Sequence, residues 1–236
     1  MTRISGVAAR DAGLLVKLVY RFTRRSLAQI TEHEPERAIE PLELYAHAPG
    51  LLLGYAMFEW ANARLDGVDK RLSYLAELKA ATLVQCEYCI DLGSQIARLS
   101  GLSDEQLLAL PRYRESELFT PLEKLVLDYA VGMSRTPVDV SDALFAELRE
   151  HLDEAQLVEL TSVIALENMR GRFNLALGVG AAGRDQCLRR GDGRPGAKRE
   201  MASLGMCLFV QRLTLKHKSS FGNCRFSSSN VTVMSR

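Results

Sequence analysis

Apolar residues recur at helical spacing along most of this chain, and this pattern constrains its fold more than any other feature. The stretch 154–172 is the clearest example, because Leu157, Leu160, Val163, Ile164 and Leu166 fall on one helical face. No run alternates apolar and polar residues with turn residues at its ends, as a half-buried strand would. The sequence therefore predicts an all-α protein.

Helix boundaries can be placed from capping residues. Ser103, Thr120, Ser141 and Asp153 each precede an apolar run, where an N-cap residue belongs. Gln106 lies three residues after Ser103, which predicts a capping box, and a proline after Thr120 suits the first helical position. The helices expected are 14–30, 42–48 (ended by Pro49 and Gly50), 51–65, one on each side of Gln85 up to Gly101, 103–110, 120–136, 141–148 and 154–172.

Charge is unevenly distributed along the 236 residues. Residues 184–236 carry 11 Lys or Arg and 3 Asp or Glu, whereas residues 1–183 carry 19 and 26. Residues 184–200 are rich in Arg, Gly and Asp without apolar periodicity, a composition typical of disorder. We expect a helical domain over 1–183 and a basic, disordered tail over 184–236. A tail that binds nucleic acid or anionic membrane is the alternative, but we expect neither partner.

Nothing in the sequence indicates a membrane span or secretion. No run of about 18 apolar residues occurs, and the N-terminus lacks the apolar core and cleavage site of a signal peptide. An odd number of cysteines, five, does not suit a secreted disulfide framework. The basic amphipathic stretch 14–30 could lie on a membrane, although docking on the core or on a neighbouring subunit is the preferred interpretation. We expect a cytoplasmic protein.

Cys86 and Cys89 are the only closely spaced cysteines in the chain. A Cys-x-x-Cys pair can cycle between dithiol and disulfide, supply half of a metal site, or simply fill space as two small apolar residues. A metal site needs further ligands, but no second Cys-x-x-Cys exists and the four histidines are scattered singly. Redox chemistry is therefore the leading interpretation, and no metal or cofactor is expected.

Both cysteines can act together if they lie on a helix. Residues three apart share a helical face, so the two sulfur atoms can point the same way. If a helix begins near Gln85, its N-terminal N–H groups favour the thiolate of a cysteine in the first turn. Such a thiolate can attack an oxidant, and its partner can then close a disulfide.

The run LKAATLVQCEYCIDLGSQIARLSGLS, together with NMRGRFNLALGVGAAG further on, resembles the carboxymuconolactone decarboxylase and alkylhydroperoxidase D superfamily. The resemblance covers about residues 10–183. It implies an all-helical, oligomeric bundle that reduces peroxides with a Cys-x-x-Cys pair. By position it makes Cys89 the peroxidatic residue and Cys86 the resolving one, with a small peroxide or related substrate, a thiol or protein reductant, and further copies of the chain as partners.

Two positions depart from the family motif. The motif has a His four residues after its second cysteine, where this chain has Gly93, and a Glu twelve residues before its first, where this chain has Tyr74. These two groups form the family's proton relay. Glu77, one turn from Tyr74, and Asp91 are the candidates to replace it, although a carboxylate beside a thiolate also disfavours that thiolate.

Two further stretches bear on the site. The end of the last helix, 167–174, is unusually polar, and Asn168, Arg172 and Asn174 could position a small substrate or hold a carboxylate. A helix end satisfied by arginine explains the same residues. The aromatic residues of 51–65, including Tyr55, suit the core or a wall of the thiol site.

Three functions follow from the sequence. The leading one is a thiol-dependent peroxidase that reduces hydroperoxides. A decarboxylase acting on a small lactone or carboxylate is the second, and a non-catalytic oligomeric protein is the third.

Overall fold

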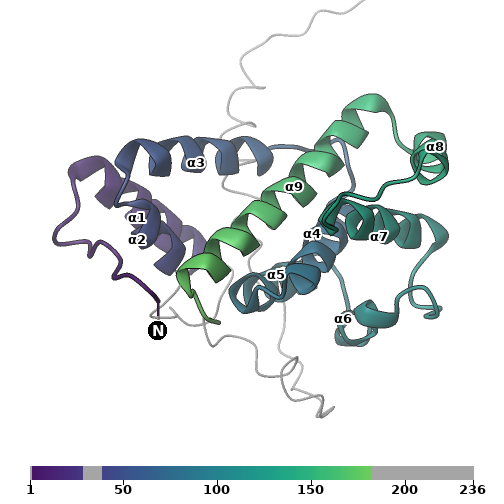
Figure 1. Cartoon of the computed structure of the whole chain (residues 1–236), viewed down its shortest axis with the longest axis horizontal. Helices are drawn as coiled ribbons and strands as arrows, with labels where there is room; N and C mark the ends of the chain where they lie inside the picture. Colours follow the sequence, from purple (N-terminus) through teal and green to yellow (C-terminus); the bar gives the residue numbers. More distant parts are fainter. Residues whose placement is uncertain (1, 29–38, 182–236) are drawn as a thin grey trace, which may run out of the picture.

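The computed structural model describes residues 2–28 and 39–181 (Figure 1). Every regular element within these ranges is helical, which confirms the all-α prediction. The elements are α1 (Leu14–Leu27), α2 (Glu40–Tyr45), α3 (Pro49–Asn62), α4 (Lys70–Val84), α5 (Glu87–Leu99), α6 (Asp104–Ala109), the short 3-10 helix η1 (Leu110–Arg112), α7 (Pro121–Ser134), α8 (Asp142–His151) and α9 (Glu154–Leu177).

Helix α4 is the central element, because it packs against α5, α7 and α9. Its Leu75, Ala76 and Ala80 are fully buried. Alanines at such positions keep side chains short, so neighbouring helices can approach α4 closely. The cysteine pair follows directly after this helix, and its position is therefore fixed by the best-packed part of the molecule.

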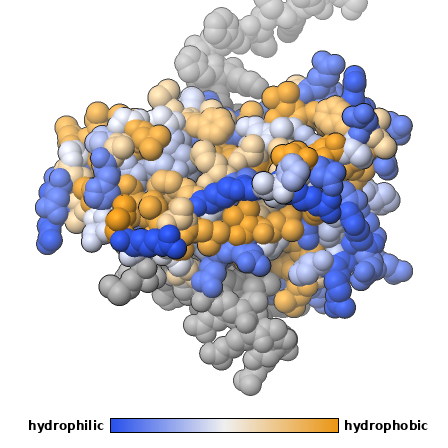
Figure 2. Space-filling model, in the orientation of Figure 1, coloured by the Kyte–Doolittle hydropathy of each residue, from blue (hydrophilic) through white to orange (hydrophobic). Residues whose placement is uncertain are grey.

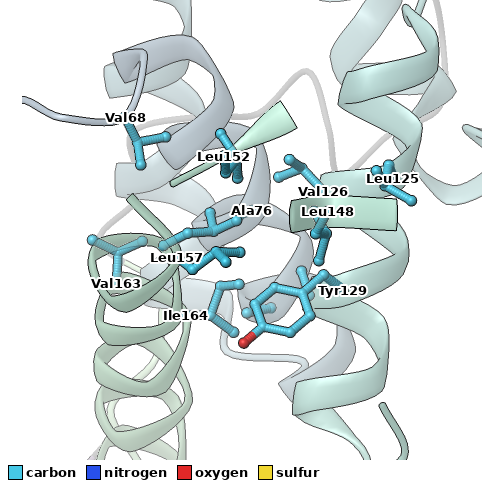
Figure 3. Close-up of a cluster of buried hydrophobic side chains, with 13 residues drawn as sticks. Val68, Ala76, Leu125, Val126, Tyr129, Leu148, Leu152, Leu157, Val163 and Ile164 are labelled. Atoms are coloured by element: carbon cyan, nitrogen blue, oxygen red, sulfur yellow. The ribbon is translucent and has the colours of Figure 1, made fainter. Parts of the chain in front are cut away.

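The largest buried cluster joins α4 to α7, α8 and α9 (Figure 3). Figure 3 shows Ile164 of α9 next to the ring of Tyr129 of α7, and both side chains are buried. Complete burial of an aliphatic side chain of this size contributes about 1.5–3 kcal/mol. This cluster anchors the first half of α9, so the second half of the helix extends in a fixed direction toward the cysteines.

The N-terminal helices α1–α3 lie on the other side of α9 from α7 and α8 (Figure 1). Val16, Tyr20 and Leu52 form a second buried cluster there, and Phe173 of α9 packs against it. Helix α9 thus contacts both groups of helices, and its last turns lie between the N-terminal layer and the cysteine segment.

Part of the surface over the N-terminal helices is apolar (Figure 2). Helix α1 buries Val16 and Tyr20 but leaves several large apolar side chains exposed, and α3 does the same. The exposed set is Leu14, Leu15, Leu18 and Phe22 on α1, and Leu51, Met57, Phe58 and Trp60 on α3. Docking of α1 on the core therefore buries only part of its apolar side chains and leaves the others exposed.

Capping residues start the helices where the sequence predicts. Ser103, Thr120 and Asp153 each cap a helix through a complete capping box, and Ser141 accepts a hydrogen bond from the backbone N–H of Leu144. These side chains satisfy backbone N–H groups that the first helical turn leaves unpaired.

Other boundaries differ from the expected ones. Pro49 begins α3 and does not end α2, because proline lacks an N–H and its φ angle suits the first helical turn. Helix α9 continues past residue 172 to Leu177 and ends at Gly178, which adopts a left-handed conformation with φ 74°. This extension carries Asn174 to the cysteines.

Some predictions lie outside the described residues. These are the C-terminal end of the 14–30 helix and the whole basic tail, so the division into 1–183 and 184–236 stays a prediction. Among the described helices, none has the length and apolarity that a membrane span requires.

Candidate functional site

The corner between α4 and α5 places the two cysteines. Gln85 ends α4 in a left-handed conformation with φ 62°, and Cys86 follows in an extended conformation as the N-cap of α5. The backbone N–H of Cys89 donates to Cys86 Sγ over 3.2 Å. The second helix therefore begins just after the first cysteine, close to the predicted position, and the two sulfur atoms are joined as a disulfide.

The cysteine pair is buried in an apolar cluster that contains Leu44, Ala81, Tyr88 and Val179. The two residues are not equally accessible, since Cys86 is 0% exposed and Cys89 is 8% exposed. A molecule that approaches the pair from solvent therefore meets Cys89 first.

One polar side chain reaches both sulfur atoms. The Nδ2 group of Asn174, on α9, donates to Cys89 Sγ over 3.6 Å and to Cys86 Sγ over 3.7 Å. Asn174 is itself buried. A buried amide that can donate to either sulfur would stabilise negative charge on whichever sulfur carries it.

Gly171 allows α9 to come this close. A Cβ atom at this position would lie 2.8 Å from Val84 Cγ1 and 3.4 Å from Cys86 Cβ. Any side chain here would therefore push α9 away from the α4–α5 corner and from the sulfur atoms.

A cluster of four charged side chains lies one helical turn before Asn174 along α9. Arg170 Nε donates to Glu59 Oε1 over 2.7 Å, and Nη2 donates to the other oxygen of the same carboxylate. Arg170 Nη1 donates to Oε2 of two further carboxylates, Glu167 at 2.9 Å and Glu77 at 3.2 Å. Helices α3, α4 and α9 thus bring three carboxylates to one guanidinium.

The surroundings raise the pKa values of two carboxyl groups in this cluster. Burial raises the pKa of Glu77 to about 7; Arg170 opposes the rise, and the charges of Glu167 and Glu59 add to it. Burial also raises the pKa of Glu167, again against the effect of Arg170. Burial would likewise raise the pKa of Glu59, but the charge and hydrogen bonds of Arg170 prevail and lower it.

Three stacked aromatic rings connect the charged cluster to the cysteine cluster. Tyr45 stacks on Phe173 with ring centroids 3.9 Å apart and on Tyr55 with centroids 4.5 Å apart. Phe173 packs against the cysteine cluster, whereas Tyr55 is hydrogen-bonded to Glu59 and Arg170. The prediction that aromatic residues of 51–65 wall the site fits Tyr55, while the aromatic Phe58 and Trp60 lie on the surface.

The other sequence-predicted site residues lie in different surroundings. Tyr74 packs against the buried cluster of Leu75, Leu78 and the α6 region. Asp91 is buried on α5, where its backbone carbonyl accepts hydrogen bonds from Ser94 and Gln95. Glu77 is held by Arg170, a cation on the same helix that presents Asn174 to the sulfurs.

The polar end of α9 divides into two groups. Asn168 donates to Ser134 Oγ and to the carbonyl of Ile164, and Arg172 donates to Asn168 Oδ1. Those two residues support the helix and its neighbour α7, which fits the structural interpretation of 167–174. Asn174 instead contacts the cysteines.

Sequence reasoning missed Glu59 and the role of Arg170. The four charges of the cluster come from three separate helices, and no local pattern links them. The signal that could have pointed to Arg170 is its position three residues after Glu167, at the unusually polar end of a helix that buries an apolar face. No group of three or more His, Cys, Asp or Glu side chains that could hold a metal ion occurs within 2–28 and 39–181.

A family model and two curated proteins match this chain in sequence. The profile of the carboxymuconolactone decarboxylase family matches residues 49–131. The uncharacterized protein YnjA of Escherichia coli (strain K12) is 35% identical over 147 residues, which cover 61% of this chain and 80% of that protein. The uncharacterized protein YdfG of Bacillus subtilis (strain 168) is 28% identical over 118 residues, covering 50% of this chain and 80% of the relative.

Solved structures share the fold at low sequence identity. The apo structure of the debrominase Bmp8 superposes with a TM-score of 0.65 at 18% identity, covering 80% of this chain and 95% of that one. The alkylhydroperoxidase AhpD core of a peroxidase-related protein from Ralstonia eutropha JMP134 gives a TM-score of 0.60 at 18% identity, covering 76% and 92%. The sequence match and the all-α fold agree with the resemblance seen in the cysteine segment, and this chain belongs to the carboxymuconolactone decarboxylase family.

Proposed function

We propose that this chain is a thiol peroxidase that reduces small hydroperoxides with Cys89 and Cys86. The observation that carries the proposal is the contact of one buried amide, that of Asn174, with both sulfur atoms. Two cysteines that served only as apolar filling would not need a shared hydrogen-bond donor in an otherwise apolar cluster.

Exposure favours Cys89 as the attacking residue. Its sulfur belongs to the more accessible cysteine of the pair, and as a thiolate it would attack the outer oxygen of the hydroperoxide. The O–O bond breaks, Cys89 becomes a sulfenic acid, and the leaving alkoxide takes a proton to become an alcohol.

The position of Cys86 suits the resolving step. As the N-cap of α5 it accepts a backbone N–H, and a helix N-terminus favours a thiolate there. This thiolate attacks the Cys89 sulfenic acid, closes the disulfide and releases hydroxide, which is protonated to water. An external thiol or protein reductant, of the kind the cytoplasm supplies, then returns the pair to two thiols.

Single cysteine variants test the assignment of roles. In Cys86→Ser, hydroperoxide should oxidise Cys89 to a sulfenic acid that a dimedone probe traps and mass spectrometry locates. In Cys89→Ser, the same treatment should leave Cys86 unlabelled. Labelling of Cys86 in the second variant would reverse the roles, and labelling of neither residue would remove the peroxidase proposal.

Reductive debromination is a second candidate, favoured by the stacked Tyr45 and Phe173 rings that adjoin the cysteine cluster. Flat aromatic rings stack on such surfaces, and the structurally similar Bmp8 is a debrominase. The same two thiols would replace the bromine of an aryl bromide by hydrogen, releasing bromide and a proton as the disulfide forms. Bromide release from tribromopyrrole, measured beside hydroperoxide consumption, distinguishes the two. Turnover of a lactone that survives loss of both cysteines would point to a decarboxylase.

We also propose that the chain forms a homo-oligomer. Helices α1 and α3 leave large apolar side chains exposed, among them Leu14, Leu18 and Met57. A contiguous group of such residues marks an interaction surface more often than a free one, and the resemblance implies an oligomer.

A further inference from the structure

The family relay of Glu and His is absent here, so the proposed cycle needs another source of the proton for the leaving alkoxide. Resting on the peroxidase function proposed above, we propose that Glu77 and Glu167, held together on one nitrogen of Arg170, share a proton and form the general acid and base of the site.

The geometry brings the two carboxyl groups to one donor atom. Oε2 of Glu77 and Oε2 of Glu167 both accept from Arg170 Nη1, at 3.2 Å and 2.9 Å. Glu59 occupies the other side of the guanidinium with both of its oxygens. One cation therefore faces three carboxylates, and two adjacent carboxylates of this kind cannot both ionise readily.

One carboxyl oxygen of the pair lacks a hydrogen bond within the described part of the chain. Oε1 of Glu167 is buried and has no hydrogen-bond partner among the described residues. An ionised carboxylate oxygen in that position would lack compensation for its lost hydration. A proton carried by the Glu77–Glu167 pair removes this cost.

Both helices that carry the pair also reach the cysteine cluster. Arg170 precedes Asn174 by one turn of α9, and Gly171 packs against Cys86. Glu77 precedes Ala81 by one turn of α4, and Ala81 belongs to the cysteine cluster. In the proposed step, the leaving oxygen of a bound hydroperoxide or a solvent molecule carries the proton between the pair and the cysteines.

The cluster also reaches solvent, as a group that exchanges protons must. The side chains of Arg170, Glu77 and Glu59 are 23–29% exposed, whereas Glu167 is nearly buried. The charged or titratable groups that face Glu77 are Arg170 and Glu167 from α9 and Glu59 from α3, with Tyr55 bonded to the same cluster.

Every proton released during one turnover is taken up by another group of the site or by a product. The ionised pair accepts the proton of the Cys89 thiol, and Glu77 and Glu167 then share this proton until they donate it to the alkoxide that leaves when the O–O bond breaks. The pair ends this half-reaction in its starting state. The proton that the Cys86 thiol loses goes to the hydroxide released in the resolving step.

Two oxidants whose leaving groups differ in acidity distinguish a proton-donating role of Glu77 from a structural one. An alkoxide such as that of cumene hydroperoxide needs a proton as it leaves, whereas the carboxylate released from a peroxyacid such as 3-chloroperbenzoic acid does not. We expect Glu77→Gln to slow oxidation of Cys89 by cumene hydroperoxide by about 100-fold and to leave oxidation by the peroxyacid nearly unchanged. Glu105→Gln, which alters an exposed carboxylate on α6, is the matched control and should change neither rate.

Glu167→Gln provides a second readout. It removes the neighbouring carboxylate, so the alkaline limb of the rate with cumene hydroperoxide should move to lower pH. Equal slowing of both oxidants in Glu77→Gln, or no slowing of either, would overturn the Glu77–Glu167 assignment while leaving the peroxidase function standing. A wild-type protein that reacts with neither oxidant would instead refute the peroxidase function itself.

Discussion

The side-chain amide of Asn174 lies 3.6 Å from Cys89 Sγ, although the two residues are 85 positions apart in the chain. Helix α9 makes this contact possible because it is anchored at its first half by the main core and passes the α4–α5 corner closely at Gly171. The thiol pair therefore depends on a helix that carries no cysteine.

Replacing Asn174 should reduce the reactivity of Cys89 at neutral pH. Asn174→Ala removes a donor worth about 1.5 kcal/mol to a thiolate, so the pH midpoint of Cys89 alkylation should rise by about one unit. Asn174→Asp should raise it further, because a second negative charge disfavours the thiolate. Iodoacetamide labelling across a pH series measures both.

Asn168→Ala is the control for that experiment. Asn168 is also a buried amide on α9, but it donates to Ser134 and Ile164 and not to sulfur. It should lower stability without moving the alkylation midpoint. A shift of equal size in both variants would mean that general loosening of α9, and not the amide donor, governs the thiols.

Gly171→Ala should destabilise the protein although alanine is the better helix former. Its Cβ would lie 2.8 Å from Val84 Cγ1, and overpacking of this kind costs about 1–3 kcal/mol, more than the ~1 kcal/mol gained from helix propensity. Urea unfolding measures the net effect. Adding Val84→Ala makes room for the new methyl group and should restore part of the lost stability; no restoration would show that the Val84 contact is unimportant.

The stability of the protein should fall as pH rises through the range in which Glu77 ionises. Burial is the main cause that raises its pKa from 4.5 to about 7, so the folded state binds the proton more tightly than the unfolded state. The resulting stabilisation is complete below about pH 4.5 and is lost as pH rises toward and through 7. Urea unfolding of Glu77→Gln should show a weaker decline between pH 5 and 8 than the wild type. Identical pH profiles would mean that Glu77 ionises normally.

A charge on the exposed apolar face should dissociate the proposed oligomer. Leu18→Glu on α1 and Met57→Glu on α3 each place a carboxylate among exposed apolar side chains. Light scattering after gel filtration should give a lower mass for at least one of them than for the wild type. Val138→Glu, at an exposed apolar residue between α7 and α8, should leave the mass unchanged. A monomeric wild type would refute the oligomer directly.

The fold could be predicted from local features because local features produce it. The N-caps at Ser103, Thr120 and Asp153 and the 3.6-residue spacing of apolar side chains act within one helix, so the sequence predicts them. The same holds for the helix start beside Cys86. Pro49 was misplaced because a proline can end one helix or begin the next, and packing decides between the two.

The site could be predicted from the sequence only where a single segment of the chain supplies its residues. Cys86 and Cys89 stand in one motif, whereas the bond between Arg170 and Glu59 joins residues 111 positions apart. Such a pair forms because α3 and α9 pack together, and no spacing in the sequence encodes that packing. Glu77 was identified from its position one turn after Tyr74, but its neighbours came from the tertiary structure alone.

The measurement that tests the central claim most directly is a thiol count on a variant in which Cys187, Cys207 and Cys224 are replaced by Ser, so that only the pair remains. After reduction and removal of the reductant, one equivalent of cumene hydroperoxide should consume two thiols per chain. Mass spectrometry should then find a Cys86–Cys89 disulfide within a single chain. Two thiols that stay free under the same treatment would contradict the proposed peroxidase function.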